Sequence, residues 1–264
     1  MKRKLSRRDF IKIAGTAGAL AALVQLTPIK SLTFLLSTPT TQSPPRLSQK
    51  QDFKWGMIID QGKCTGCNFC TYTCKAVNNV PPDIYWNYVF TEKIGTSPNT
   101  KTLFMPRPCM HCEKAPCVDV CPVKATYKRK DGIVMMNYDR CIGCRYCMVA
   151  CPYGARSFNW REYKEPFEYS PTWGYPEVPR RSKGVVEKCT FCVHRIDAGL
   201  ERGLMPGVDR SATPACVNIC PVEARHFGDL INPDSEVSKL LTQNKAFRLR
   251  EELGVEPRVY YLPP

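Results

Sequence analysis

Sixteen cysteines in four groups of four constrain this 264-residue chain more than any other feature. Two groups have the spacing C-x2-C-x2-C-x3-C, one has a wider gap, and the last is split by a long insertion. In chain order the groups are Cys64, Cys67, Cys70, Cys74; Cys109, Cys112, Cys117, Cys121; Cys141, Cys144, Cys147, Cys151; and Cys189, Cys192, Cys216, Cys220. Disulfides, structural zinc and iron–sulfur clusters are the three physical candidates.

The spacing favours iron–sulfur clusters. Disulfides between cysteines so close in sequence would be strained. Zinc sites typically use two C-x2-C pairs separated by a dozen or more residues, and only the split group resembles that pattern. Three close cysteines, a fourth after three more residues and then proline form the run of [4Fe–4S] ferredoxins, in which the fourth thiolate binds the neighbouring cluster. Pro122, Pro152 and Pro221 fit this run, whereas Lys75 follows Cys74 and departs from it without removing a ligand.

This crossing rule predicts four [4Fe–4S] clusters and their ligands. Each set takes three cysteines from one group and one from another. The predicted sets are Cys64, Cys67, Cys70 with Cys220; Cys189, Cys192, Cys216 with Cys74; Cys109, Cys112, Cys117 with Cys151; and Cys141, Cys144, Cys147 with Cys121. The first two sets make one module and the last two make another, so one module is inserted within the other. Metal binding should then supply much of the folding energy.

We therefore predict an α+β fold of two nested dicluster ferredoxin-like modules with loop-rich connections. Asp131-Gly132 lies between Lys128–Lys130 and Ile133–Asn137, which indicates a hairpin. A return strand is expected near Ala155–Trp160, and helices are expected within residues 235–253, after Asp234. The predicted organisation is a signal region (1–30), a linker (31–51), an outer module (52–99 and 183–230), an inner module (100–160), a connection rich in proline and aromatic residues (161–182) and a C-terminal helical extension and tail (231–264).

The N-terminus has the layout of an export signal. Arg7 and Arg8 are followed by Phe10, Ile11 and a Gly/Ala-rich apolar run to about Leu26, which matches the twin-arginine signature. The alternatives are an ordinary amphipathic helix or a Sec signal. The run is shorter than the about 20 residues that cross a bilayer, although an uncleaved signal could still act as an anchor. The twin-arginine route exports folded proteins, so thiolates could receive metal before export.

The basic charge does not indicate a nucleic-acid partner. The first 30 residues carry a net +6 of the formal +14, which leaves +8 for the remainder. Four oxidised clusters with their thiolates add about −8 in total. The mature protein would thus be about neutral and would have little electrostatic affinity for nucleic acid.

No motif for catalysis is present in the sequence. There is no Gly-rich phosphate loop after a strand and no nucleophile elbow. His111 and His194 lie inside cysteine loops, where packing near a cluster is favoured over ligation, and no partner can be assigned to His226. Residues 161–183 are either a surface connection packed on the modules or a docking strap for a partner. We expect a non-catalytic protein.

The segments 109–156, 183–195 and 215–230 resemble the iron–sulfur subunits of the dimethyl sulfoxide reductase and polysulfide reductase family, over about residues 52–262. With the signal, the chain is most similar to the exported branch, which includes menaquinol-linked complexes. The resemblance implies single-electron transfer between a multi-helix quinone-binding membrane subunit and a cytochrome or catalytic subunit, at the periplasmic face of the membrane. A molybdopterin reductase is the alternative partner. A zinc-stapled binding protein is the alternative from another class.

Overall fold

The computed structural model describes residues 52–165, 167–168 and 170–264. The predicted signal, including Arg7 and Arg8, lies outside the described residues. The strands are β1 (Trp55–Asp60), β2 (Tyr88–Ile94), β3 (Lys101–Arg107), β4 (Thr126–Lys128), β5 (Val134–Met136), β6 (Ser157–Phe158), β7 (Val186–Glu187), β8 (Arg225–Asp229) and β9 (Val259–Leu262). The helices are α2 (Phe69–Val77), α3 (Pro116–Asp119), α4 (Tyr146–Val149), α5 (Val193–Glu201), α6 (Ala215–Asn218), α7 (Glu236–Gln243) and the 3-10 helix η2 (Glu251–Leu253).

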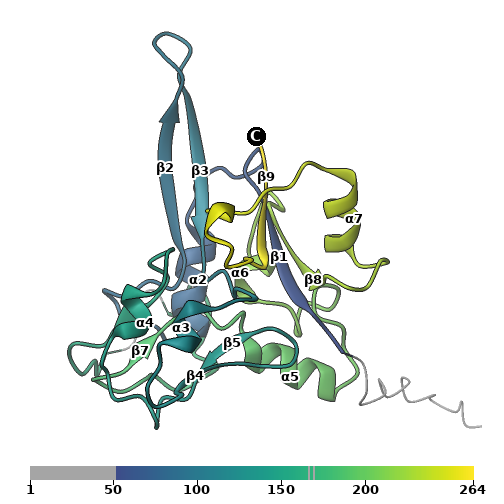
Figure 1. The fold of residues 1–264 in the computed structure, drawn as a ribbon. Helices are drawn as coiled ribbons and strands as arrows, with labels where there is room; N and C mark the ends of the chain where they lie inside the picture. The colour runs from purple at the N-terminus through teal and green to yellow at the C-terminus, as the bar shows by residue number, and fades with distance from the viewer. Residues whose placement is uncertain (1–51, 166, 169) are drawn as a thin grey trace, which may run out of the picture. The chain divides into compact units, whose positions relative to one another are not determined.

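A three-stranded sheet joins the two ends of the described chain. Its order is β8-β1-β9, with β1 antiparallel to β8 and parallel to β9 (Figure 1). Strand β1 is the apolar run WGMIID and is almost entirely buried, as expected for a central strand covered on both faces. Met57 pairs with Phe227 on one side and with Val259 on the other. The sheet therefore holds the residues around Cys220 next to those just before Cys64.

Helix α7 confirms the helix expected after Asp234. The Oγ atom of Ser235 accepts a hydrogen bond from the backbone N–H of Ser238 at 3.2 Å, which satisfies one of the free donors at the helix start. Val237 is fully buried in a cluster with Ile58 and Leu262. The helix thus packs its apolar side on the face of the three-stranded sheet that carries Ile58.

The predicted hairpin around Asp131-Gly132 is confirmed. Strands β4 and β5 pair antiparallel, with Lys128 opposite Val134, and Gly132 has a φ of 86°. The return strand is present as β6, but it pairs with β7. Strand β7 lies directly before Lys188 and Cys189, so this pairing links the inner cysteine groups to the split group.

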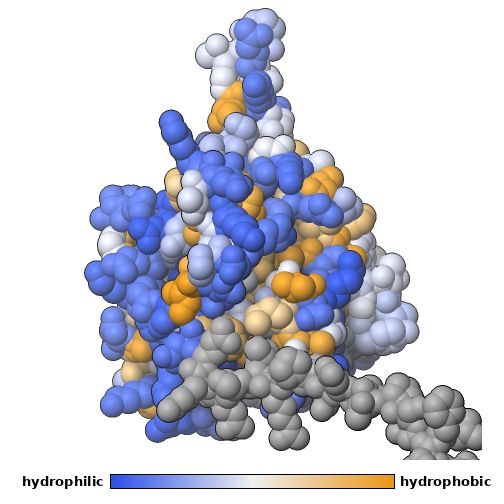
Figure 2. Space-filling view, turned by 90° about the vertical axis from the view of Figure 1, so that its right-hand side faces the viewer, coloured by the Kyte–Doolittle hydropathy of each residue, from blue (hydrophilic) through white to orange (hydrophobic). Residues whose placement is uncertain are grey.

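A second hairpin, β2–β3, was not predicted. It projects from the body of the molecule, and its far end is mainly hydrophilic (Figures 1 and 2). Strand β2 is exposed on both faces, so its sequence lacks the alternation of a half-buried strand. Strand β3 is at least partly buried from Leu103 to Arg107. There the Phe104 ring lies against Gly66 so closely that a Cβ atom on Gly66 would be 2.3 Å from Cδ1.

The connection of residues 161–182 contains no helix or strand among its described residues, and it packs on the body. Arg181 donates to the carbonyl oxygen of Asn78 at 2.6 Å and to the buried carboxylate of Glu187 at 2.5 Å. Glu177 accepts hydrogen bonds from Arg195, with Nη2 to Oε1 at 2.7 Å. The packing expected of a surface connection is thus present.

Across the described ranges, every helix is too short or too polar to traverse a bilayer.

Candidate iron–sulfur sites

All sixteen cysteines lie in the described ranges as free thiols, so the structure contains no disulfide among them. They gather in four places, which we name sites A, B, C and D. In residues 52–264, apart from 166 and 169, no three Cys, His, Asp or Glu side chains converge as a single metal ion requires.

Site A is a cavity at the base of the β2–β3 hairpin. Its cysteines are Cys64, Cys67, Cys70 and Cys220. Gly66 and Asn68 have positive φ values of 72° and 61°, which turn the loop tightly before α2 begins. The backbone N–H of Ala224 donates to Cys220 Sγ at 3.2 Å.

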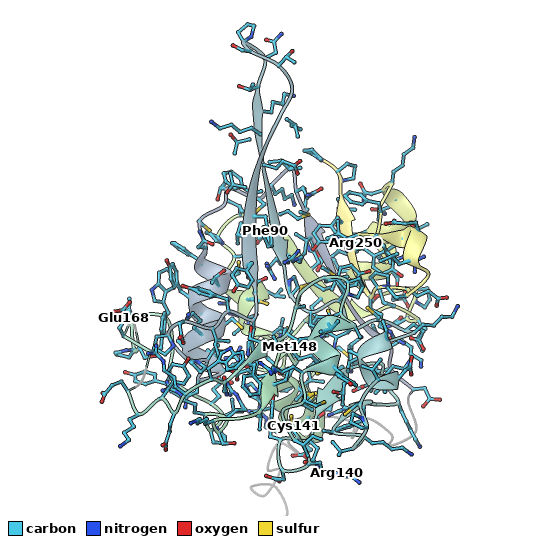
Figure 3. All side chains as sticks on the ribbon, turned by 60° about the vertical axis from the view of Figure 1, so that its left-hand side comes forward. Phe90, Arg140, Cys141, Met148, Glu168 and Arg250 are labelled. Carbon is cyan, nitrogen blue, oxygen red and sulfur yellow. The ribbon has the colours of Figure 1, made fainter. Side chains whose placement is uncertain are left out.

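Site D is a similar cavity at the other cysteine-rich end. Its cysteines are Cys121, Cys141, Cys144 and Cys147. Gly143 and Arg145 repeat the positive φ values of the first loop, at 69° and 65°. The backbone N–H of Ala125 donates to Cys121 Sγ at 3.2 Å. In Figure 3, Cys141 lies toward the end of the molecule away from the hairpin that carries Phe90.

Site B is buried beneath α2 and α5. Burial, followed by the thiolates of Cys189, Cys192 and Cys216, raises the pKa of the Cys74 thiol well above its usual value. All four of these cysteines are buried. The side-chain amide of Asn78 donates to two of their sulfurs, Cys74 Sγ at 3.6 Å and Cys192 Sγ at 3.5 Å.

Site C lies between sites B and D. Burial, followed by the thiolates of Cys109, Cys117 and Cys151, raises the pKa of the Cys112 thiol. Arg156 donates from Nη2 to Cys117 Sγ at 3.0 Å. The structure therefore brings together the same four sets of cysteines that the crossing rule predicts.

The sites follow one another in the order A, B, C, D. Sites A and B meet at α2, which carries Cys70 and Cys74, and sites C and D meet at α3, which carries Cys117 and is followed by Cys121. Sites B and C meet where Cys189 of site B lies near Cys109 of site C. Burial, followed by the negative charge of the Cys109 thiolate, raises the pKa of the Cys189 thiol. Lys188 is fully buried at this junction and donates to the carbonyl oxygen of Cys189 at 2.7 Å.

The histidines and Lys75 have partners of their own. His111 is buried, stacks on Phe191 with ring centroids 3.8 Å apart and accepts a hydrogen bond from the N–H of Val134. His194 Nε2 lies 2.8 Å from a carboxylate oxygen of Glu177. His226, for which the sequence showed no partner, lies 2.8 Å from a carboxylate oxygen of Glu236. Lys75 donates to the carbonyl oxygen of Ile84 at 2.9 Å, which gives its place after Cys74 a structural role.

Four polar side chains at these sites were not singled out from the sequence. Asn78 and Asn87 each donate to a cysteine sulfur, the latter to Cys70 Sγ at 3.2 Å. Arg156 and Arg225 are both buried beside thiols. The arginines could have been found from a repeat, because each is the sixth residue of a Cys-Pro-x-x-Ala-Arg motif.

The donor set fits [4Fe–4S] clusters. Each site brings four cysteine sulfurs together, and at each site at least one N–H group of the chain donates to sulfur. Such N–H···S hydrogen bonds, together with burial, are the interactions that tune cluster potentials. A cluster supplies a site that gains and loses one electron.

Comparison with protein families supports this chemistry. Two models described as 4Fe–4S dicluster domains match the chain, one over residues 100–165 and the other over residues 63–125 and 140–224. A model of the twin-arginine translocation signal matches residues 4–24. The predictions of four [4Fe–4S] clusters and of a twin-arginine signal are confirmed.

Curated relatives are iron–sulfur subunits of oxidoreductases. A selenate reductase subunit of Mesobacillus selenatarsenatis is 44% identical, over 80% of this chain and 72% of the relative. The iron–sulfur cluster-binding subunit of menaquinone reductase from Nitratidesulfovibrio vulgaris is 44% identical, over 79% of this chain and 88% of the relative. The Hdr-like menaquinol oxidoreductase iron–sulfur subunit 1 of Archaeoglobus fulgidus is 38% identical, over 97% of each chain.

These matches confirm the resemblance drawn from the cysteine segments. One dicluster model covers all sixteen cysteines of sites A to D, and the other covers those of sites C and D. The relatives match most of their own lengths. The chain belongs to the family of iron–sulfur electron-transfer subunits of the dimethyl sulfoxide reductase and polysulfide reductase type.

Proposed function

We propose that the sixteen cysteines bind the four clusters in the crossed sets of sites A to D, and that single electrons pass along the row A, B, C, D. The protein connects a quinone-linked membrane subunit with a cytochrome or catalytic subunit and performs no catalysis itself. Two of the relatives named above act with menaquinone or menaquinol by their descriptions, which favours a menaquinol-linked complex. The selenate reductase relative supports the alternative, a molybdopterin reductase partner.

The exposure of the cysteines carries this proposal. Site A has one exposed cysteine, Cys67, and site D has one, Cys144. In sites B and C every cysteine is buried except Cys151, which is half-buried. An electron carrier between two proteins needs a redox site near the surface at each end and shielded sites between them. The row has that arrangement.

Large apolar side chains surround site D on the outside. Ile142 is 64% exposed, Tyr146 62% and Val149 87%, and Trp160 is 63% exposed. Isolated exposed apolar residues are ordinary, whereas a group around one redox site indicates an interface. We propose that a partner subunit covers this end of the row, and that the assembled complex lies at the periplasmic face of the membrane.

The arrangement of modules follows from the same sets. Sites A and B use cysteines from both ends of the described chain, and sites C and D use only cysteines from 109 to 151. We therefore propose that the inner module (100–160) is inserted within the outer one (52–99 and 183–230). The pairing of β1 with β8 closes the outer module, and the β4–β5 hairpin belongs to the inner module.

Paired cysteine variants test the ligand sets. Cys112→Ser and Cys151→Ser should alter the same cluster signal in electron paramagnetic resonance spectra of the reduced protein, whereas Cys144→Ser and Cys121→Ser should alter a different one. No prior assignment of signals is needed. If Cys151→Ser and Cys144→Ser altered the same signal, the crossed sets would be wrong.

Purification of the tagged protein from membranes tests the partners. Mass spectrometry of the bound chains should find a multi-helix membrane protein together with a cytochrome or a molybdopterin subunit. A Val149→Asp variant should lose one of these chains while keeping its iron. Recovery of the tagged protein alone from membranes would contradict the proposed complex.

A further inference from the structure

Two arginines occupy the same place in the two modules. Each closes a Cys-Pro-x-x-Ala-Arg motif, from Cys151 to Arg156 and from Cys220 to Arg225. Both are nearly inaccessible, with 5% and 4% of the residue exposed. Arginine is almost never buried to this extent without partners that compensate its charge. The partners therefore show what each charge does.

Arg156 lies between site C and site D. Its Nη2 donates to Cys117 Sγ of site C at 3.0 Å. On the other side is Cys147 of site D, where burial raises the pKa of the thiol and the Arg156 guanidinium opposes that rise. Nη1 donates to the hydroxyl of Thr126 at 3.3 Å and lies 3.1 Å from the sulfur of Met136.

Arg225 lies between site A and site B in the same way. Burial raises the pKa of the Cys216 thiol of site B to about 12, and the Arg225 guanidinium opposes that rise. Burial alone lowers the pKa of Arg225, but the thiolates of Cys70 in site A and Cys216 in site B outweigh it and raise the pKa. Nη2 donates at 2.7 Å to Oδ1 of Asn87, whose amide in turn donates to Cys70 Sγ at 3.2 Å.

The likeness extends to the surroundings of the two guanidinium groups. Nη1 of Arg225 lies 3.6 Å from the sulfur of Met57 on β1, as Nη1 of Arg156 lies against Met136 on β5. Arg225 begins β8, and Arg156 directly precedes β6. No carboxylate is bonded to either arginine among the hydrogen bonds and ion pairs of the described residues. The cysteine sulfurs that would hold the clusters are thus the groups placed to compensate both charges.

We propose that Arg156 and Arg225 are positioning residues that raise the potentials of the two clusters flanking each of them, C and D for Arg156, A and B for Arg225. This inference rests on the ligand sets of the proposed function. A reduced cluster carries one more negative charge than an oxidised one, and a fixed positive charge in a buried, weakly polarisable environment favours the reduced form. Because each guanidinium is shared, the two clusters of one module should shift together.

The test is a redox titration of all four cluster signals in the complete membrane-purified complex. Arg156→Gln should lower the midpoint potentials of C and D and leave A and B unchanged. Arg225→Gln is its matched counterpart and should do the reverse. Arg156→Lys and Arg225→Lys keep the charge but lose the forked guanidinium, whose two Nη atoms contact separate partners, so the same pairs should shift by less.

Unchanged potentials in the glutamine variants, or an equal fall in all four clusters, would overturn the inference. If a glutamine variant loses iron, the lysine variants decide. A shift confined to the flanking pair then supports the role, and no shift or a shift of all four clusters contradicts it. Iron content and the paired cysteine spectra test the ligand sets independently. If the cysteine variants alter the cluster signals in the expected pairs but the arginine variants leave the potentials unchanged, only the role of the arginines is refuted.

Discussion

Cys70 and Cys74 lie one turn apart on α2 but belong to different sites. Cys70 lines the cavity of site A together with Cys220. Cys74 is buried among Cys189, Cys192 and Cys216 of site B. Residues four apart on a helix project from the same face at about 5–6 Å between Cβ atoms. This one helix therefore fixes the distance between two redox sites.

Serine variants of this pair should affect different clusters. Cys74→Ser should remove or convert the cluster of site B, because three thiolates remain, and should leave the signal of site A intact. Cys70→Ser should do the opposite. Iron analysis should show a loss of about one to four irons per chain in each variant, if the cluster becomes three-iron or is lost. Loss of the same signal in both variants would show that α2 serves one cluster only.

The cysteine spacing predicted the site far better than it predicted the fold around it. The groups of thiols match the predicted sets because a short loop holds three cysteines together, while the fourth lies on or after the following helix and meets another group. The Asp131-Gly132 hairpin was predictable for a similar local reason, since that dipeptide fits the turn with a positive φ at Gly132.

What the sequence did not reveal depends on residues far apart in the chain. The pairing of β6 with β7 joins Phe158 to Val186, and nothing local in either two-residue strand indicates a partner. Strand β2 is exposed on both faces, so no hydrophobic period marks it. Asn78 is an ordinary residue after a helix until the fold brings Cys192 to its amide.

Asn78 should tune the cluster of site B. Its side-chain amide donates to Cys74 Sγ and Cys192 Sγ, and also to the carbonyl oxygen of Cys74 at 3.1 Å. Hydrogen bonds to sulfur stabilise the reduced, more negative cluster. Asn78→Leu should lower the potential of cluster B and, because buried hydrogen bonds are lost, should cost about 1–3 kcal/mol of stability.

The matched control is Asn244→Leu, which removes an exposed amide that bonds only to the carbonyl oxygen of Leu240. A redox titration of both variants checks the expectation. Equal potentials for cluster B in the wild type and Asn78→Leu would show that the amide serves packing alone.

Glu177 should make the attachment of the connection sensitive to acid. Burial alone raises the pKa of Glu177, but hydrogen bonds from His194 and Arg195 outweigh it and lower the pKa from 4.5 to about 2. A pKa below the unfolded value stabilises the fold above the unfolded pKa, and that stabilisation is lost as pH falls through the folded pKa. The contribution is thus complete above about pH 4.5 and disappears toward pH 2.

Glu177→Gln should accordingly have a lower thermal midpoint than the wild type at neutral pH, and the difference should shrink as pH falls below 4.5. Glu162→Gln, in the exposed part of the same connection, is the control and should show no difference at either pH. A difference between Glu177→Gln and wild type that stays constant across this range would exclude the carboxylate charge as its cause.

Export should depend on Arg7 and Arg8, which lie within the matched twin-arginine signal. Replacing both by lysine keeps the positive charge of the N-terminus but removes the paired guanidinium groups, so the double variant should accumulate inside the cell with its clusters assembled. Fractionation and iron analysis of the cytoplasm measure this outcome. Lys2→Arg is a control that leaves the pair intact and should be exported normally. Export of the double-lysine variant at the wild-type level would mean that another route carries the protein, and its thiols would then meet an oxidising compartment before cluster assembly.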